Sequence, residues 1–136
     1  MVSLKQLERN KNMIQEDKEI LLIDLCARLP YGTKVRAFIG EKGENDEILG
    51  CVHIFNIYAH NCKPYLRPMS SMTEEECIEL GNIKATIENI SEVIPNVPYY
   101  IEVAYSKQID WLNAHHFDYR GLIEKGLAIE APEGMY

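Results

Sequence analysis

The sequence lacks what several common protein classes require. It contains no apolar run near the roughly 20 residues that a membrane-spanning helix needs. Its four cysteines form no C-x-x-C pair, the spacing typical of zinc and redox motifs. Its eight glycines form no phosphate-binding loop. The first residues also lack the apolar segment of a signal peptide. These absences predict a soluble cytoplasmic protein with reduced, buried thiols and no disulfide framework.

Positive charge is scarce as well. The chain has 14 Lys and Arg residues against 21 Asp and Glu residues, a formal net charge of −7. Such a surface opposes attraction to phosphate backbones and to anionic membranes. A local basic patch for a nucleic acid remains an alternative, and its residues would be Lys34, Arg36, Lys63 and Arg67.

A chain of 136 residues suits one domain with a conventional core. Residues 1–16 are mostly polar and predict a loosely held helix or a mobile arm. The first strong helical pattern begins at Asp17, which can cap it, and ends at Pro30 and Gly32. We therefore treat residues 1–136 as a single domain that begins with a largely buried helix.

The middle of the chain has the period of strands. Residues 33–39 alternate as a half-buried strand does, and residues 40–46 form a polar loop. Residues 48–59 predict one bent strand or a hairpin that turns near Asn56. Prolines in the run 63–68 confine it to a sheet edge. Together these runs predict a small antiparallel sheet, for which an SH3-like barrel is one arrangement.

The last half predicts further helices. Thr73 and Glu76 have the spacing of a capping box, and the apolar pattern runs on to about Val93. Residues 99–104 alternate as a strand, and Ser106 can cap a helix over 107–114. Asp118 can cap a short helix that ends at Gly126, with Leu122, Ile123 and Leu127 buried. The predicted fold class is therefore α+β, with an N-terminal helix, a central helix and a C-terminal helical corner.

Three blocks carry a resemblance: CARLPYG at 26–32, KPYLRPMSSMTEEE at 63–76 and WLNAHHFDYRGLI at 111–123. In them the chain resembles a family of small proteins found in gut bacteria and in their phages and mobile elements. No activity is assigned to that family. The resemblance therefore implies a biological setting, and it implies no cofactor and no catalytic residue.

Two groups of residues could carry chemistry. Cys51, His53, His60 and Cys62 form a mirrored pair that offers four ligands for tetrahedral zinc, but their spacing is not that of a zinc module. The simpler reading is two buried thiols and two partly exposed imidazoles, so no cofactor is expected.

The other group is His115, His116 and Asp118, which could be metal ligands or a general-base pair with its orienting acid. Adjacent residues of a helix point about 100° apart, so both histidines face one site only if the helix ends between them. The alternative is structural: Asp118 caps the next helix, while Tyr119 and Arg120 tie the corner to the sheet.

No serine or cysteine has the local context of a nucleophile, so an enzyme is the less favoured reading. We expect a non-enzymatic accessory or interaction protein of phage or mobile-element type, whose partner is a protein or a second copy of the chain. The rival hypotheses are a metal-dependent hydrolase and an SH3-like nucleic-acid-binding module. Aromatic and arginine side chains are the usual interface anchors, and the candidate binding residues are Tyr65, Arg67, Trp111, His115, His116, Asp118, Tyr119 and Arg120.

Overall fold

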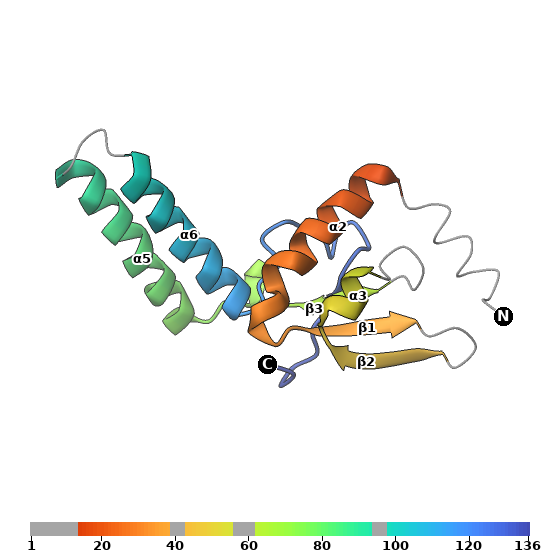
Figure 1. Cartoon of the computed structure of the whole chain (residues 1–136). Helices are drawn as coiled ribbons and strands as arrows, with labels where there is room; N and C mark the ends of the chain where they lie inside the picture. The colour runs from red at the N-terminus through yellow and green to blue at the C-terminus, as the bar shows by residue number, and fades with distance from the viewer. Residues whose placement is uncertain (1–13, 39–42, 56–61, 94–97) are drawn as a thin grey trace.

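The computed structural model describes residues 14–38, 43–55, 62–93 and 98–136, and between residues 87 and 104 it describes the helical backbone only. Helix α2 lies along a four-stranded sheet, and a hairpin made of helices α5 and α6 projects from one end of this body (Figure 1). The α+β fold class is therefore confirmed. The expected arm at residues 1–16 lies largely outside the described residues.

Helix α2 spans Gln15–Arg28 and starts two residues before the predicted cap. Asp17 lies in its first turn instead, where a carboxylate suits the positive end of the helix dipole. The 3-10 turn η1, Leu29–Tyr31, follows and ends at Gly32. Gly32 has a φ of 66°, a left-handed conformation that glycine adopts without strain, and it redirects the chain into the sheet.

The sheet is mixed. Its order is β2 (Glu44–Ile48), β1 (Lys34–Phe38), β3 (Lys63–Leu66) and β4 (Ile129–Glu130). Strand β1 is antiparallel to both neighbours, whereas β3 and β4 run parallel. The purely antiparallel sheet was therefore wrong, and an SH3-like barrel is not confirmed. Part of the predicted loop 40–46 belongs to β2, whose polar sequence reflects an exposed edge strand.

Strand β3 lies inside the sheet, so its predicted edge position was wrong. Pro64 is opposite Val35 of β1. The carbonyl of Thr33, just before β1, accepts a hydrogen bond from the amide of Leu49, just after β2, so the peptide groups of Thr33 face β2. Alternate residues of a strand turn their peptide groups to the same neighbour, so Val35 also faces β2. Because the peptide groups of Val35 face β2, they require no N–H donor from β3, and Pro64 can lie opposite Val35.

The predicted strand or hairpin over residues 48–59 was wrong for residues 51–55. Residues Cys51–Phe55 form the short helix α3, and residues 56–61 lie outside the described part. The amide of His53 donates to the Gly50 carbonyl, and the Gly50 amide donates to Nδ1 of the same histidine at 2.9 Å. These local hydrogen bonds hold a helical turn despite the β-branched residues around it.

Helix α5, Glu74–Val93, confirms the central helix. Its capping box is formed, because the Thr73 amide donates to Glu76 Oε1 at 3.0 Å and the Glu76 amide donates to Thr73 Oγ1 at 3.2 Å. Helix α6 spans Pro98–Ala114, so the predicted strand 99–104 is helical and Ser106 is no cap. Pro98 suits the first helical position, where its missing N–H costs nothing.

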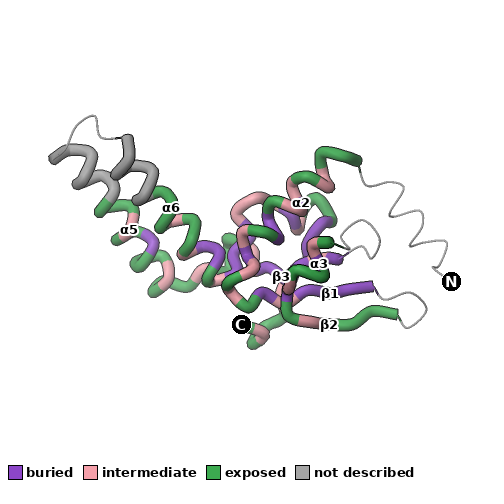
Figure 2. Tube along the Cα trace, in the orientation of Figure 1, coloured by how far each residue is buried: buried purple, intermediate pink, exposed green. Residues whose placement is uncertain are grey.

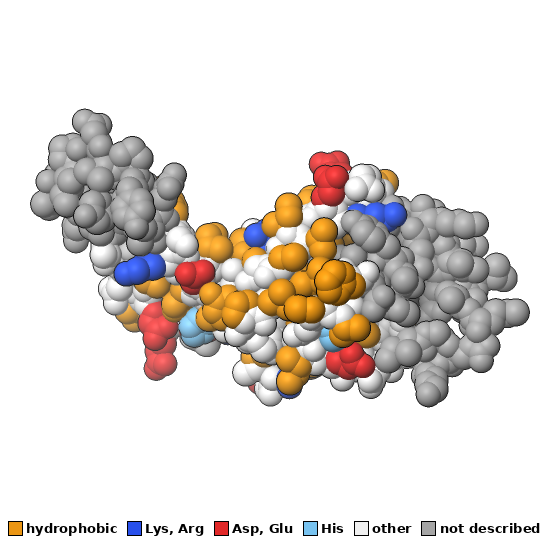
Figure 3. Space-filling view, in the orientation of Figure 1, with side chains coloured by type: hydrophobic (Ala, Val, Ile, Leu, Met, Phe, Trp, Pro, Cys, Tyr) orange, Lys and Arg blue, Asp and Glu red, His pale blue; other side chains and the backbone are white. Residues whose placement is uncertain are grey.

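Apolar packing forms two clusters. The larger lies between α2 and the sheet, and the smaller joins the hairpin to the body through Leu80, Leu112 and Phe117 (Figure 2). Hydrophobic side chains also gather on the surface around α2 and α3 (Figure 3), where Ile23 and Phe55 are exposed. The expectation of buried thiols holds only for Cys62, whereas three cysteines lie on outer helix faces: Cys26, Cys51 and Cys77.

Candidate functional site

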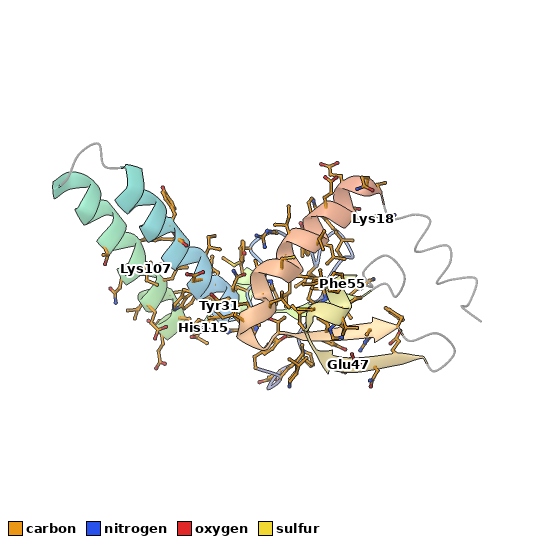
Figure 4. The ribbon with its side chains drawn as sticks, viewed as in Figure 1. Lys18, Tyr31, Glu47, Phe55, Lys107 and His115 are labelled. Carbon is orange, nitrogen blue, oxygen red and sulfur yellow. The ribbon has the colours of Figure 1, made fainter. Side chains whose placement is uncertain are left out.

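The block that the sequence singled out lies where the hairpin meets the body; His115 and Tyr31 mark this junction in Figure 4. Helix α6 ends at Ala114, and His116 has a φ of 63°, which turns the chain sharply. The Arg67 amide then donates to the His116 carbonyl at 2.7 Å, and the Asp118 amide donates to the Arg67 carbonyl at 2.8 Å. Residues 116–118 therefore lie beside the end of β3.

The two histidines make separate contacts. The His115 ring stacks on Trp111, with centroids 4.1 Å apart, and its Nδ1 lies 3.4 Å from Glu76 Oε2. The His116 ring stacks on Tyr136 at 3.6 Å, and its Nδ1 lies 3.1 Å from Thr33 Oγ1. Each imidazole thus belongs to its own set of neighbours, and the predicted general-base pair is not assembled.

Asp118 caps a turn, where a short helix was predicted. Its Oδ1 accepts from the Leu122 amide at 2.8 Å, and its Oδ2 accepts from the Ile123 amide at 3.0 Å. Gly121 has a φ of 73°, a left-handed conformation that interrupts a regular right-handed helix. Gly126 has the same φ, which is the conformation expected of the predicted C-cap. Both carboxylate oxygens bind backbone, so Asp118 does not orient either histidine.

A buried ionic cluster holds the same junction, and the sequence analysis missed it. Arg28 is fully buried; its Nε donates to Asp24 Oδ2 at 2.8 Å, and its Nη2 donates to the Phe117 carbonyl at 2.7 Å. Arg120 donates to the other oxygen of Asp24 at 2.7 Å. The spacing of four residues between Asp24 and Arg28 on a helix was the signal that could have revealed this pair.

Arg67 is also engaged within the fold. Its two terminal nitrogens donate to the two oxygens of Glu76 at 2.8 and 2.7 Å, and its guanidinium lies 4.1 Å from the centre of the Phe117 ring. The hydrogen bonds from Arg67 lower the pKa of Glu76 to about 2. This bidentate pair ties the end of β3 to the first turn of α5.

The predicted aromatic anchors serve internal contacts too. Tyr65 is buried, which corrects its expected exposure, and its hydroxyl donates to Asp46 Oδ1 at 2.7 Å. Trp111 donates to Glu79 Oε2 at 3.1 Å. The Tyr119 hydroxyl donates to the Asn113 side-chain oxygen at 2.8 Å, and Tyr119 packs against Arg28 and Arg120.

The zinc candidates are not brought together in the described part of the chain, which contains no group of three or more His, Cys, Asp or Glu residues placed to hold a metal. His53 accepts the Gly50 amide at Nδ1, so its Nε2 carries the proton and faces Glu47 Oε2 at 2.6 Å. Burial raises the pKa of the Cys62 thiol to about 12. Cys51 is exposed at the start of α3, and His60 lies outside the described residues.

The basic residues proposed for nucleic acid are partly compensated inside the fold. Arg36 pairs with Glu44 at 3.3 Å and with Asp46 at 3.6 Å. The Lys34 ammonium donates to the Met135 carbonyl at 3.3 Å, and Arg67 pairs with Glu76. Lys63 is half-buried at the start of β3. These contacts disfavour a basic binding surface.

A hollow of about 640 Å³ lies between the start of α5 and the last residues of the chain; we call it the tail hollow. The Arg67–Glu76 pair forms part of one wall. Glu130 and Glu133 also line the hollow, and both are exposed. The lining residues are Arg67, Pro68, Ser71, Thr73, Glu76, Glu130, Ala131, Pro132, Glu133, Gly134 and Tyr136.

No helix in the described parts of the chain has the length and apolar character needed to span a membrane. Comparisons with protein-family models, with curated proteins and with solved structures found no match to this chain.

Proposed function

We propose that this chain is a non-enzymatic interaction protein of phage or mobile-element type, which receives a positively charged segment of a partner protein in the tail hollow. The observation that carries the proposal is the difference among the three carboxylates that line the hollow. Glu76 is met by Arg67, whereas Glu130 and Glu133 have no ion-pair partner among the described residues. The hollow therefore has a net negative charge that a lysine or arginine side chain would neutralise.

The separation of His115, His116 and Asp118 within the described residues supports the non-enzymatic part of this proposal. His115, His116 and Asp118 bind different partners, so the general-base pair expected from these three residues is not formed. Burial also keeps the Cys62 thiol protonated by raising its pKa to about 12, so this thiol is not an activated nucleophile. Binding requires only shape and charge, which the hollow provides.

The phage or mobile-element setting is supported by the resemblance in the three sequence blocks. The block at 63–76 supplies one wall of the hollow, including Arg67, Ser71 and Thr73. The residues that carry the resemblance therefore also shape the proposed binding surface.

Affinity capture from a bacterial lysate tests the proposal. The bait proteins are the wild type, a Glu130→Gln, Glu133→Gln variant, and a matched Glu16→Gln, Glu19→Gln variant on the exposed face of α2. A basic partner should bind the wild type and the α2 control, and should be lost from the hollow variant and at high salt. Equal capture by all three baits would exclude the hollow, and metal-dependent turnover of a substrate would show an enzyme.

A further inference from the structure

The residues after β4 form a strap that returns across the sheet. The Ala131 amide donates to the Leu66 carbonyl at 2.8 Å, which continues the β3–β4 pairing by one step. Gly134 has a φ of 82° and turns the strap, so that Tyr136 lies against β1 and β3. We define the strap as residues 131–136; its residues 131–134 and 136 line the tail hollow.

The Tyr136 hydroxyl occupies the place of a missing sheet hydrogen bond. It accepts from the Lys34 amide at 2.8 Å and donates to the Tyr65 carbonyl at 2.8 Å. The antiparallel register of β1 and β3 pairs Val35 with Pro64, so Lys34 and Tyr65 would form the next pair of opposite residues. In an antiparallel ladder this pair would exchange hydrogen bonds directly. The Tyr136 hydroxyl therefore lies between the Lys34 amide and the Tyr65 carbonyl, which could form a hydrogen bond with each other in its absence.

The Tyr136 ring covers His116. The two centroids are 3.6 Å apart, and burial raises the pKa of Tyr136 to about 12, so its hydroxyl remains protonated. Basic side chains from several elements act on the His116 ring: Arg28 of α2, Lys34 of β1, Arg67 after β3, and His115. The Thr33 hydroxyl is its neutral neighbour. These neighbours favour the neutral form of the His116 imidazole over the protonated form.

We propose that the strap is a releasable latch with two states, and that protonation of His116 opens it. In the closed state Tyr136 lies between Lys34 and Tyr65 and caps His116. In the open state the Lys34 amide and the Tyr65 carbonyl pair directly, and His116 is exposed to water. Opening also removes a wall of the tail hollow. The effect of this change on partner binding rests on the proposed function, whereas the latch itself does not.

The direction of the pH effect follows from the closed state. Burial, together with the basic groups around the ring, lowers the pKa of His116 from 6.5 to about 4. In the open state the imidazole is hydrated, and its pKa returns toward 6.5. The equilibrium constant for closing should therefore be constant above pH 6.5 and fall about tenfold for each pH unit between 6.5 and 4. Below pH 4 it should level off.

NMR of the full chain tests the latch without any partner. The readouts are the cross-relaxation between the Tyr136 and His116 rings and the amide shift of Lys34, followed from pH 7.5 to 4.5. Tyr136→Phe keeps the ring stack but lacks the bridging hydroxyl, so it should open at a higher pH than the wild type. His116→Asn tolerates the left-handed backbone and should remove the pH response. Tyr105→Phe, at an exposed tyrosine of α6, is the matched control and should behave as the wild type.

The latch is refuted if the ring contact and the Lys34 shift stay constant over this pH range in wild-type protein whose circular dichroism shows it folded. An unchanged pH response in folded His116→Asn would refute the assigned trigger. If a variant fails to fold, the wild-type titration alone decides. Loss of partner capture with an intact latch would count against the proposed function only.

Discussion

The Arg28 guanidinium donates to the carbonyl oxygen of Phe117 at 2.7 Å, across 89 positions of sequence. This contact fixes the end of α2 against the segment that follows α6. The same guanidinium shares Asp24 with Arg120, so one buried carboxylate connects α2 to the turn that follows α6. The residues that looked reactive in the sequence are thus arranged around a structural joint.

Asp24→Ala should destabilise the fold by about 3–5 kcal/mol, because it leaves Arg28 buried without its counter-charge. Urea unfolding followed by circular dichroism measures the change. The control is Glu44→Ala, which breaks an ion pair with Arg36 whose members are 48% and 35% exposed and should cost less than about 1 kcal/mol. Similar losses in both variants would contradict a special role for the buried cluster.

Asp118→Ala should cost about 1–2 kcal/mol, since one carboxylate satisfies the amides of both Leu122 and Ile123. The shift in the urea midpoint relative to wild type is the measurement. Asp110→Ala provides the comparison, because that exposed aspartate accepts a hydrogen bond from the Tyr31 hydroxyl at 3.3 Å and caps no backbone amide among the described residues. An unchanged midpoint in Asp118→Ala would mean that the turn holds without its cap.

Stability should fall in acid in two separable ranges. The pKa of Glu76 is lowered from 4.5 to about 2, so the stability it contributes is complete above pH 4.5 and is lost as the pH falls toward 2. The loss is on the order of 3 kcal/mol. Glu76→Gln should flatten the unfolding free energy over this range in a urea titration at each pH. A variant that keeps the wild-type slope there would show that another carboxyl causes it.

His116 should affect the unfolding free energy at a higher pH than Glu76 does. Its pKa is lowered in the folded state, so its neutral form stabilises the fold, and that contribution declines as the pH falls from 6.5 toward 4. The unfolding free energy of His116→Asn should therefore vary less over this range than that of the wild type. Parallel curves for the two proteins would contradict this assignment.

Protein purified without added metal should contain no stoichiometric zinc. The reason is that His53 uses Nδ1 to accept the Gly50 amide and Nε2 to bind Glu47, so neither nitrogen is available as a ligand. Elemental analysis before and after dialysis against a chelator provides the test, with a melting curve on the same samples. One zinc per chain, whose removal lowers the melting midpoint, would overturn this prediction.

The sequence predicted elements that depend on local signals. The capping box at Thr73 and Glu76 requires only residues three positions apart, and it forms as expected. The alternation in β1 survives because this strand is central and half-buried. In both cases the local preference agrees with the packing around it.

The sequence-based predictions of secondary structure were wrong where packing overrides local preference. Residues 99–104 are rich in tyrosine and β-branched side chains and alternate like a strand, yet they continue α6 from Pro98. Such residues favour strands only where a neighbouring strand is present. Here the neighbour is the antiparallel helix α5, and the helical period prevails.

The candidate site was foreseen only in part. The density of polar residues at 115–120 did mark a junction, but its partners come from far away in the sequence. Tyr136 reaches His116 only because β4 pairs with β3, and no local spacing encodes that pairing. The buried Asp24–Arg28 pair was readable from helical spacing, but its contact with Phe117 was not.

The division of the apolar packing into two clusters has a dynamic consequence. Among the side chains that the structure describes, the hairpin meets the body through the smaller cluster of Leu80, Leu112 and Phe117, whereas α2 and the sheet share the larger one. A smaller cluster means a smaller free energy of local opening where the hairpin meets the body, so hydrogen exchange should be faster at this end of α5 and α6 than along β1. The hairpin would then unfold as a separate cooperative unit while the sheet keeps its structure. Phe117, packed between Trp111 and Arg67, marks the boundary between the two units.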